Sequence, residues 1–288
     1  MGIDVHGLSF LRYAKKLCNF GKTITIGRQA IDANESVVRT SIATNANYRN
    51  ERYCEQLLID YFGSTVVDSI DNSSFEGASI VHDMNQALPP NVQSLYETVI
   101  DGGCLEHIYN IPQALKNCSL LCKHGGQIVH ILPANNFCGH GFWQFSPELF
   151  FSLYSVENGY QDTEVFLADL SDSSRWYKVR PPEGGRRVNV YSSTQIYVLV
   201  RTVLGRGAFS HSNVQQSDYV FEWTSGPTNA MNGGKPAERN MIVRFVRQSP
   251  RLYSLLYPLY NLYLRKKSIS KLCKSNPNLL EIKIASVL

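Results

Sequence analysis

Three aspartates each close a short apolar run in the first half of this 288-residue sequence. Asp71 ends the first run, Asp83 the second and Asp101 the third. We expect each run to be a β-strand, and ligands of an open α/β sheet bind at the carboxyl ends of its strands. Any one aspartate could equally be a helix cap or a turn residue. Their repetition favours a shared acidic site that accepts hydrogen bonds from a polar ligand.

Further side chains suited to chemistry follow the third aspartate. His107 and His140 titrate in the range useful to a general base, which would remove a proton from a hydroxyl nucleophile. A structural hydrogen-bonding role explains either histidine equally well. Glu106, beside His107, is a candidate for substrate binding. Phe142 and Trp143 could form the floor of a substrate site for a sugar face or a planar ring, although ordinary packing explains them too.

The elements that must position these residues alternate between strand-like and helix-like patterns. The β-branched run 23–26 stops at Gly27, as expected of a buried strand that enters a turn. Gly125 and Gly126 suggest the C-terminal cap of a helix before the next strand. The alternation predicts an α/β fold with a mainly parallel sheet covered on both faces. We expect strands at 23–26, 65–71, 78–81, 97–100 and 127–132, helices at 51–62 and 105–121, and an antiparallel edge from 163–167 and 194–203.

Composition excludes several classes of protein. Hydrophobic residues make up 43% and charged residues 18%, which is typical of a globular chain and not of a disordered one. The N-terminal sequence lacks the continuous apolar stretch of a secretory signal, so we expect a cytoplasmic protein. Seven cysteines without C-x-x-C spacing predict neither a disulfide framework nor a zinc ribbon, and we expect no bound metal.

The C-terminal part of the chain differs in charge from the rest. From Lys235 onward it holds eleven Lys or Arg and two Glu, a net charge of +9, whereas the whole chain carries +4. The preceding part is therefore mildly acidic, at −5. Because 225–236 has the Gly, Asn and Pro content of a linker, we divide the chain into a domain at 1–224 and a basic, aromatic-rich extension at 225–288.

The segment 250–274 packs Leu and Tyr between basic residues. One interpretation is peripheral contact with an anionic membrane surface, and the other is docking of the leucines onto the domain or onto a second copy in a homo-oligomer. The basic residues follow no recognisable nucleic-acid-binding motif, so we expect no nucleic acid as a partner.

A more specific signal lies between residues 96 and 160. Tyr96 to His107 reads YETVIDGGCLEH, and Lys123 to Gly126 reads KHGG. These segments resemble the fourth motif of the class I S-adenosylmethionine-dependent methyltransferases and the Lys-Pro-Gly-Gly turn of that family, with His124 in place of the proline. The segment around 146–148, Ser-Pro-Glu, is similar to the family's next helix start. The resemblance covers about residues 20–205 and implies a Rossmann-like three-layer sandwich with a seven-stranded sheet and an antiparallel edge strand.

The resemblance implies S-adenosylmethionine as cofactor and assigns roles to individual residues. Asp71 would bind the ribose hydroxyls, because a carboxylate can accept two hydrogen bonds from a diol. Asp83 would accept the adenine amino group, with Met84 over a ring face. Asp101 and Gly102 would line the methionine side of the cofactor site.

The first motif departs from the family pattern. The family expects several glycines after the first strand, but the chain has only Gly27 followed by Arg28, Gln29 and Ala30. Gly27 precedes Asp71 by 44 positions, whereas about 20 separate the equivalent residues of dinucleotide-binding folds, so residues 31–50 would be an inserted loop or lid. Either Arg28 rebuilds the loop and binds the cofactor's carboxylate, or cofactor binding is lost.

Two functions follow from these alternatives. With the loop rebuilt, we expect in-line methyl transfer, a reaction accelerated mainly by positioning, to the oxygen of a small-molecule or glycan-type acceptor. With cofactor binding lost, we expect a non-catalytic binding or scaffold protein. A nicotinamide-dependent oxidoreductase would need G-x-G-x-x-G after the first strand, and the sequence lacks it there.

Overall fold

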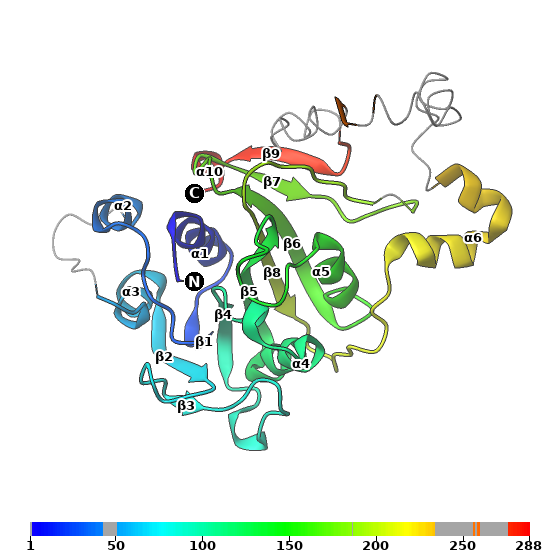
Figure 1. Ribbon diagram of the computed structural model, residues 1–288. Coiled ribbons are helices and arrows are strands. Elements are labelled where there is room, and N and C mark those ends of the chain that lie inside the picture. The colour runs from blue at the N-terminus through cyan, green and yellow to red at the C-terminus, as the bar shows by residue number, and fades with distance from the viewer. Residues whose placement is uncertain (1, 43–50, 186, 234–255, 257, 260–275) are drawn as a thin grey trace.

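The computed structural model describes residues 2–42, 51–185, 187–233, 256, 258–259 and 276–288, without the side chains of 226–233. Its centre is one nine-stranded mixed sheet in the order β3-β2-β1-β4-β5-β8-β6-β7-β9 (Figure 1). The first five strands of that order pair in parallel, and the remaining neighbours pair antiparallel. The strands are β1 (Gly21–Ile26), β2 (Ser64–Asp71), β3 (Ile80–Val81), β4 (Tyr96–Asp101), β5 (Cys122–Asn135), β6 (Tyr160–Asp169), β7 (Arg175–Val179), β8 (Ile196–Leu204) and β9 (Leu279–Lys283).

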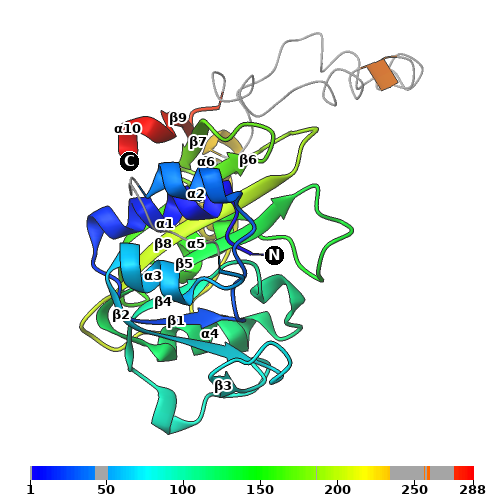
Figure 2. The same cartoon turned by 90° about the vertical axis from the view of Figure 1, so that its left-hand side faces the viewer.

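Helices cover both faces of the sheet. On one face lie α1 (Val5–Leu17), α2 (Glu35–Ser41) and α3 (Glu55–Phe62), which stand in front of the strands in Figure 2. On the other face lie α4 (Ile111–Leu121) and α5 (Pro147–Leu153) (Figure 1). Each helix layer shares its own apolar cluster with the sheet, as Phe10 of α1 and Leu115 of α4 illustrate. The predicted three-layer α/β arrangement is therefore observed.

Neighbouring residues of one strand serve the two opposite clusters. Val99 of β4 packs toward α4 and α5, whereas Ile100 packs toward α1 and α3. Both side chains are fully buried, because successive side chains of a strand point to opposite faces and both faces carry helices. This explains the continuous apolar runs from which the central strands were predicted.

Two predictions about the antiparallel part of the sheet were wrong: the sheet has nine strands and not seven, and the predicted edge pair lies inside it. β8 is internal, between β5 and β6, because nearly every residue of its IYVLVRTVL sequence is buried and such a strand needs neighbours on both sides. The predicted pairing of the two runs at 163–167 and 194–203 is confirmed. β7 and β9 extend the sheet beyond them, with Arg175 in register with Lys283.

Two local predictions around α4 were also wrong. The helix begins at Ile111 and not near residue 105, where a single 3₁₀ turn, η2 (Leu105–His107), follows β4 instead. It ends at Leu121, so Gly125 and Gly126 do not cap it but lie within β5. Gly125 has a φ of +81°, at the point where the register between β4 and β5 shifts. Gly125 therefore permits the irregular backbone at the start of β5.

Both predicted appendages contain described elements. Within the inserted segment 31–50, α2 packs with α1, and residues 43–50 lie outside the described part. In the C-terminal extension, β9 and the short helix α10 (Ile284–Val287) join the main sheet and its core. Helix α6 (Ser217–Gly233) extends away from the sheet in Figure 1.

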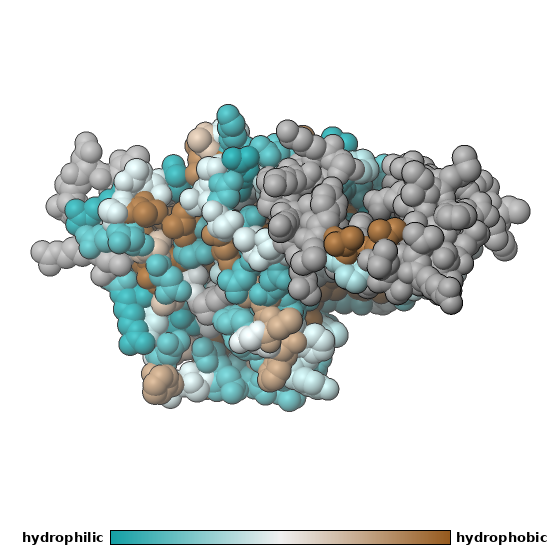
Figure 3. Space-filling model, turned by 45° about the horizontal axis from the view of Figure 1, so that its top comes forward, coloured by the Kyte–Doolittle hydropathy of each residue, from teal (hydrophilic) through white to brown (hydrophobic). Residues whose placement is uncertain are grey.

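The predicted membrane-contact segment 250–274 falls outside the described residues, apart from Leu256, Pro258 and Leu259. Among the described helices, none has both the length and the apolar character needed to cross a bilayer. On the face turned forward in Figure 3, the described apolar residues are scattered in small groups among hydrophilic ones.

Candidate functional site

The order of the parallel strands reverses between β1 and β4. β1 pairs with β2 on one side and with β4 on the other, and Ile26 at its end is in register with both Ile70 and Asp101. The chain therefore leaves all three strands at one place. Such a switch point is where open α/β sheets bind their ligands. Gly27 follows with a φ of +70°, and its amide donates to the carbonyl of Ile70 at 2.7 Å.

Asp71 lies at this edge with its side chain partly exposed. One carboxylate oxygen, Oδ1, accepts a hydrogen bond from the amide of Ser73 at 3.1 Å. Its backbone carbonyl accepts from the amide of His82 at 2.8 Å, which ties the end of β2 to the chain after β3. The predicted position at a strand end is thus observed, with a carboxylate that solvent reaches.

Asp83 and Met84 follow β3, the strand that pairs in parallel with β2. Oδ1 of Asp83 accepts from the backbone and side-chain nitrogens of Asn85, and these hydrogen bonds hold the pKa of the Asp83 carboxyl below its usual value. Met84 is only 4% exposed and belongs to the core beneath α4. Its carbonyl accepts from Asn117 Nδ2 at 3.1 Å. Met84 is therefore a packed core residue in this structure.

Arg28 is held by three partners within the protein. Its Nε donates to Oε1 of Glu55 at 2.6 Å, and its Nη1 donates to the carbonyl of Glu76 at 2.7 Å. The guanidinium also stacks 4.0 Å from the centroid of the Tyr53 ring. These contacts join the loop after β1 to α3 and to the loop before β3. They fix the Arg28 side chain within the protein and engage two of its five N–H donors.

Gln29, which sequence reasoning did not single out, lies at the centre of the switch point. The residue is 3% exposed, and its side-chain Nε2 donates to the carbonyl of Ile26 at 2.6 Å. Its Oε1 is buried without a hydrogen-bond partner among the residues the structure describes. A Cβ atom on Gly102 would lie 2.6 Å from that oxygen, so the glycine is needed to let the carboxamide approach.

Asp101 is fully buried and uses both carboxylate oxygens inside the protein. Oδ1 accepts from the amides of Cys104 at 3.0 Å and Leu105 at 3.3 Å, which fixes the start of η2. Oδ2 lies 3.0 Å from Nδ1 of His130 on β5, whose Nε2 lies 2.7 Å from the Tyr154 hydroxyl. Asp101 therefore positions the turn that carries Glu106 and His107. Any effect of Asp101 on a bound ligand would be indirect, through the position of this turn.

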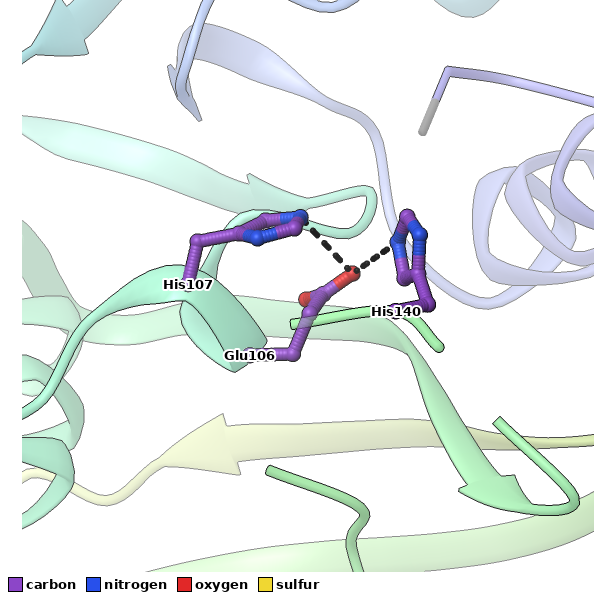
Figure 4. Close-up of side chains that lie close together, drawn as sticks. All are labelled: Glu106, His107 and His140. Carbon is purple, nitrogen blue, oxygen red and sulfur yellow. Dashed lines mark ion pairs between the residues drawn. The ribbon is translucent and has the colours of Figure 1, made fainter. Parts of the chain in front are cut away.

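Glu106, His107 and His140 form a compact cluster beside this turn (Figure 4). Oε1 of Glu106 lies 3.8 Å from Nε2 of His107 and 3.3 Å from Nε2 of His140. The two imidazole rings meet edge to face, with centroids 4.9 Å apart. The Glu106 side chain is fully buried, whereas 47% of the His107 side chain and 33% of the His140 side chain are exposed. The structure thus brings close together three residues that the sequence singled out as candidates for chemistry, from two separate segments of the chain.

The loop after β5 brings His140 to Glu106. The Glu106 carbonyl accepts from the amides of Phe142 at 2.7 Å and Trp143 at 3.3 Å, which clamps the loop over η2. Gly141 makes this approach feasible, because its φ is +69° and a Cβ atom there would lie 2.8 Å from both Cγ and the carbonyl oxygen of Glu106. A side chain at 141 would push the two segments apart.

Burial governs the ionisation of the cluster. Desolvation, followed by the nearby Asp101 carboxylate, raises the pKa of Glu106 to about 8. Desolvation lowers the pKa values of His107 and His140, and repulsion from His140 adds to the effect on His107. The two imidazoles are therefore neutral near pH 7 and able to accept a proton or to donate a lone pair.

An apolar cavity of about 550 Å³ adjoins the two segments that carry the cluster. Trp143 lines it, with its indole Nε1 fixed by a hydrogen bond to the carbonyl of Ile108 at 2.9 Å. Tyr109, 75% exposed, stands on the same cavity with its ring centroid 6.4 Å from that of Trp143. Phe142 is 71% exposed but does not line the cavity. Of the two aromatic residues predicted for the substrate site, only Trp143 lines this cavity, together with Tyr109, which was not predicted.

Comparison with known proteins gives structural neighbours only. No family model matches the sequence, and no curated protein matches it. Similar solved structures include an S-adenosylmethionine-dependent methyltransferase from Thermotoga maritima, with 16% identity, a TM-score of 0.39, and coverage of 69% of this chain and 90% of that chain. Another is the 1,6-didemethyltoxoflavin-N1-methyltransferase of Burkholderia thailandensis with bound S-adenosylhomocysteine, at 10% identity, TM-score 0.38, and 70% and 78% coverage.

A third neighbour has a different activity. The branched-chain polyamine synthase of Thermus thermophilus is 12% identical, with a TM-score of 0.38 and coverage of 73% of this chain and 59% of that chain. At these identities and TM-scores the similarities carry no argument about function. The function must therefore be argued from the residues of this chain.

Substitution of Asp101 tests its positioning role. We expect Asp101→Ala to lower the free energy of unfolding by about 2–4 kcal/mol, because it leaves buried donors on η2 and His130 without an acceptor. Asp101→Asn keeps an acceptor oxygen and should cost about half as much. Urea denaturation measures both values. Equal stability of the wild type and Asp101→Ala would show that the carboxylate does not fix the turn.

Gly141 and Gly139 form a matched pair for testing the clamp. We expect Gly141→Ala to cost about 1–3 kcal/mol, since it combines a positive φ with close contacts to Glu106. Gly139→Ala should change stability by less than about 0.5 kcal/mol, because a Cβ atom there meets nothing within 4 Å. Thermal unfolding of the two variants distinguishes them. A similar effect of both substitutions would argue against close packing of the loop on Glu106.

Proposed function

We propose that the protein binds S-adenosylmethionine at the carboxyl ends of β1, β2 and β4 and transfers its methyl group to a small-molecule or glycan-type oxygen acceptor. One observation carries the proposal: the switch point of the parallel core gathers Gly27, Asp71 and Gly102 at one edge. The sequence resemblance between residues 96 and 160 supports S-adenosylmethionine as the cofactor.

The residues at this edge suit the two halves of the cofactor to different degrees. For the nucleoside half, Asp71 offers a partly exposed carboxylate at the end of β2, which suits a ribose diol. On the methionine side, the Gln29 carboxamide lies where a ligand would approach Gly102. Gln29 packs against Gly102, so binding requires its side chain to move aside.

The acceptor would lie in the cavity between Tyr109 and Trp143. Both aromatic rings border it, and rings of this kind suit a planar ring or a sugar face. His107 and His140 lie on the same two segments as these rings and have lowered pKa values. Either neutral imidazole could accept the proton of an acceptor hydroxyl near pH 7. The protein's contribution would otherwise be orientation of the two reactants.

A second function has an observation in its favour. The carboxamide of Gln29 lies against Gly102, and Arg28 is already bonded to Glu55 and to the Glu76 carbonyl. With these contacts kept, the Gln29 carboxamide blocks the approach to Gly102 on the methionine side of the site. The chain would then be a non-catalytic binding or scaffold protein with the same fold.

Calorimetric titration with S-adenosylhomocysteine distinguishes the two functions. We expect the wild type to bind it, Asp71→Ala to lower the affinity at least tenfold through loss of the diol contact, and Gln29→Ala to raise it severalfold by opening the site. Asp60→Ala, on the exposed face of α3, is the matched control and should bind as the wild type does.

The contrary result is equally definite. Absence of binding by both the wild type and Gln29→Ala, with each protein shown to be folded, would reject the methyltransferase proposal and favour the scaffold.

A further inference from the structure

We propose that Glu106, His107 and His140 bind one divalent first-row transition-metal cation, with Zn²⁺ as the representative ion. The sequence predicted no metal, because the usual cysteine spacings are missing and the three residues come from two segments more than thirty residues apart. They become a candidate site only when the loop after β5 folds over η2.

The separations of the ligand atoms fit a single small cation. Oε1 of Glu106 lies 3.3 Å and 3.8 Å from the Nε2 atoms of His140 and His107, and the three ligand atoms lie within 4.8 Å of one another. Ligands bonded to tetrahedral Zn²⁺ at about 2.0–2.2 Å are about 3.3–3.6 Å apart. Two imidazoles already point at the same carboxylate oxygen (Figure 4). Small rotations of the half-exposed His107 ring would close the remaining difference.

Burial supplies an independent reason. The Glu106 side chain is fully buried, and neither of its oxygens has a hydrogen-bond donor among the described residues. Nε2 of His140 is also buried without a hydrogen-bond partner in that part of the chain. Buried polar atoms without partners are costly, and ionising a buried carboxyl group needs a compensating charge. A cation bound to Oε1 of Glu106 and to Nε2 of His140 would satisfy two of these three atoms at once.

The donor set indicates the class of metal. Two neutral imidazole nitrogens and one carboxylate oxygen suit Zn²⁺, Fe²⁺ or Mn²⁺ better than Mg²⁺ or Ca²⁺, which prefer oxygen ligands throughout. Three protein ligands leave at least one coordination position open, as in metal sites that bind an external ligand.

The open position suggests what the cation would do, and this step rests on the proposed function. Solvent reaches His107, and the two segments that carry the cluster also line the aromatic cavity at Tyr109 and Trp143. A hydroxyl oxygen of an acceptor in that cavity would be the natural fourth ligand. Coordination would orient the oxygen and lower the pKa of the hydroxyl, whose proton would pass to solvent water. With the cation bound, this replaces the general-base role of His107 and His140. This coordination narrows the acceptor class to compounds that present a hydroxyl group beside a planar or sugar ring.

Metal titration of the full chain tests the site without the cofactor. The protein is stripped with a chelator, exchanged into chelator-free buffer and titrated with Co²⁺ by visible absorption and with Zn²⁺ by calorimetry. We expect one equivalent to bind and to raise the midpoint of thermal unfolding. Glu106→Gln and His107→Ala should each lower the affinity at least tenfold.

The variants are chosen so that folding does not obscure the result. Glu106→Gln keeps the shape of the buried side chain, and His107 is exposed enough for truncation to be tolerated. His82→Gln, an imidazole outside the cluster, is the matched control and should bind as the wild type does. Failure of the wild type to bind one equivalent, or unchanged binding by both cluster variants, would overturn the metal site. Metal binding without S-adenosylhomocysteine binding would instead reject the methyl-transfer proposal alone.

Discussion

The buried carboxylate of Asp101 is the contact on which the site depends. One of its oxygens holds the amides that begin η2, and the other holds His130 of the neighbouring strand. A charge buried in the core is tolerated only when its hydrogen bonds are satisfied, so this arrangement is hard to vary. It sets the direction in which Glu106 and His107 leave the sheet. The loop that carries His140 then docks on the Glu106 carbonyl.

The same edge of the sheet contains two neighbouring but different environments. At the ends of β1 and β4, the Gln29 side chain packs against Gly102. Beyond η2, the Glu106 carboxyl group and Nε2 of His140 are buried without hydrogen-bond partners among the described residues, as Oε1 of Gln29 also is. A partner for the atoms of this cluster must come from outside the described residues, whereas a ligand at Gly102 must displace Gln29. This difference explains why the metal proposal is independent of the cofactor proposal.

Much of the parallel core could be predicted from sequence, because its strands are buried on both faces and appear as β-branched or continuous apolar runs. β8 could also be found in this way, but its place inside the sheet could not, since a run such as IYVLVRTVL does not identify its neighbours. β7 mixes charged and aromatic residues, and β9 joins it from about a hundred residues away. Such long-range pairing leaves no local signal.

Only part of the candidate site could be predicted from the sequence, because the rest depends on contacts between distant segments. Positions at strand ends, such as Asp71 and Asp101, follow from the strand pattern. Contacts made where two loops fold over each other, such as Gln29 on Gly102 and His140 on Glu106, do not. The one local sign of the second contact is Gly141, whose positive φ is required there but is not distinguishable in the sequence from that of any other glycine.

A crystal structure of the protein grown with S-adenosylhomocysteine tests the central claim, that the switch point between β1 and β4 is a ligand site, most directly. The account predicts the nucleoside beside Asp71 and the Gln29 carboxamide turned away from Gly102. A structure in which Gln29 still rests on Gly102 and the compound is bound elsewhere, or not at all, would contradict it.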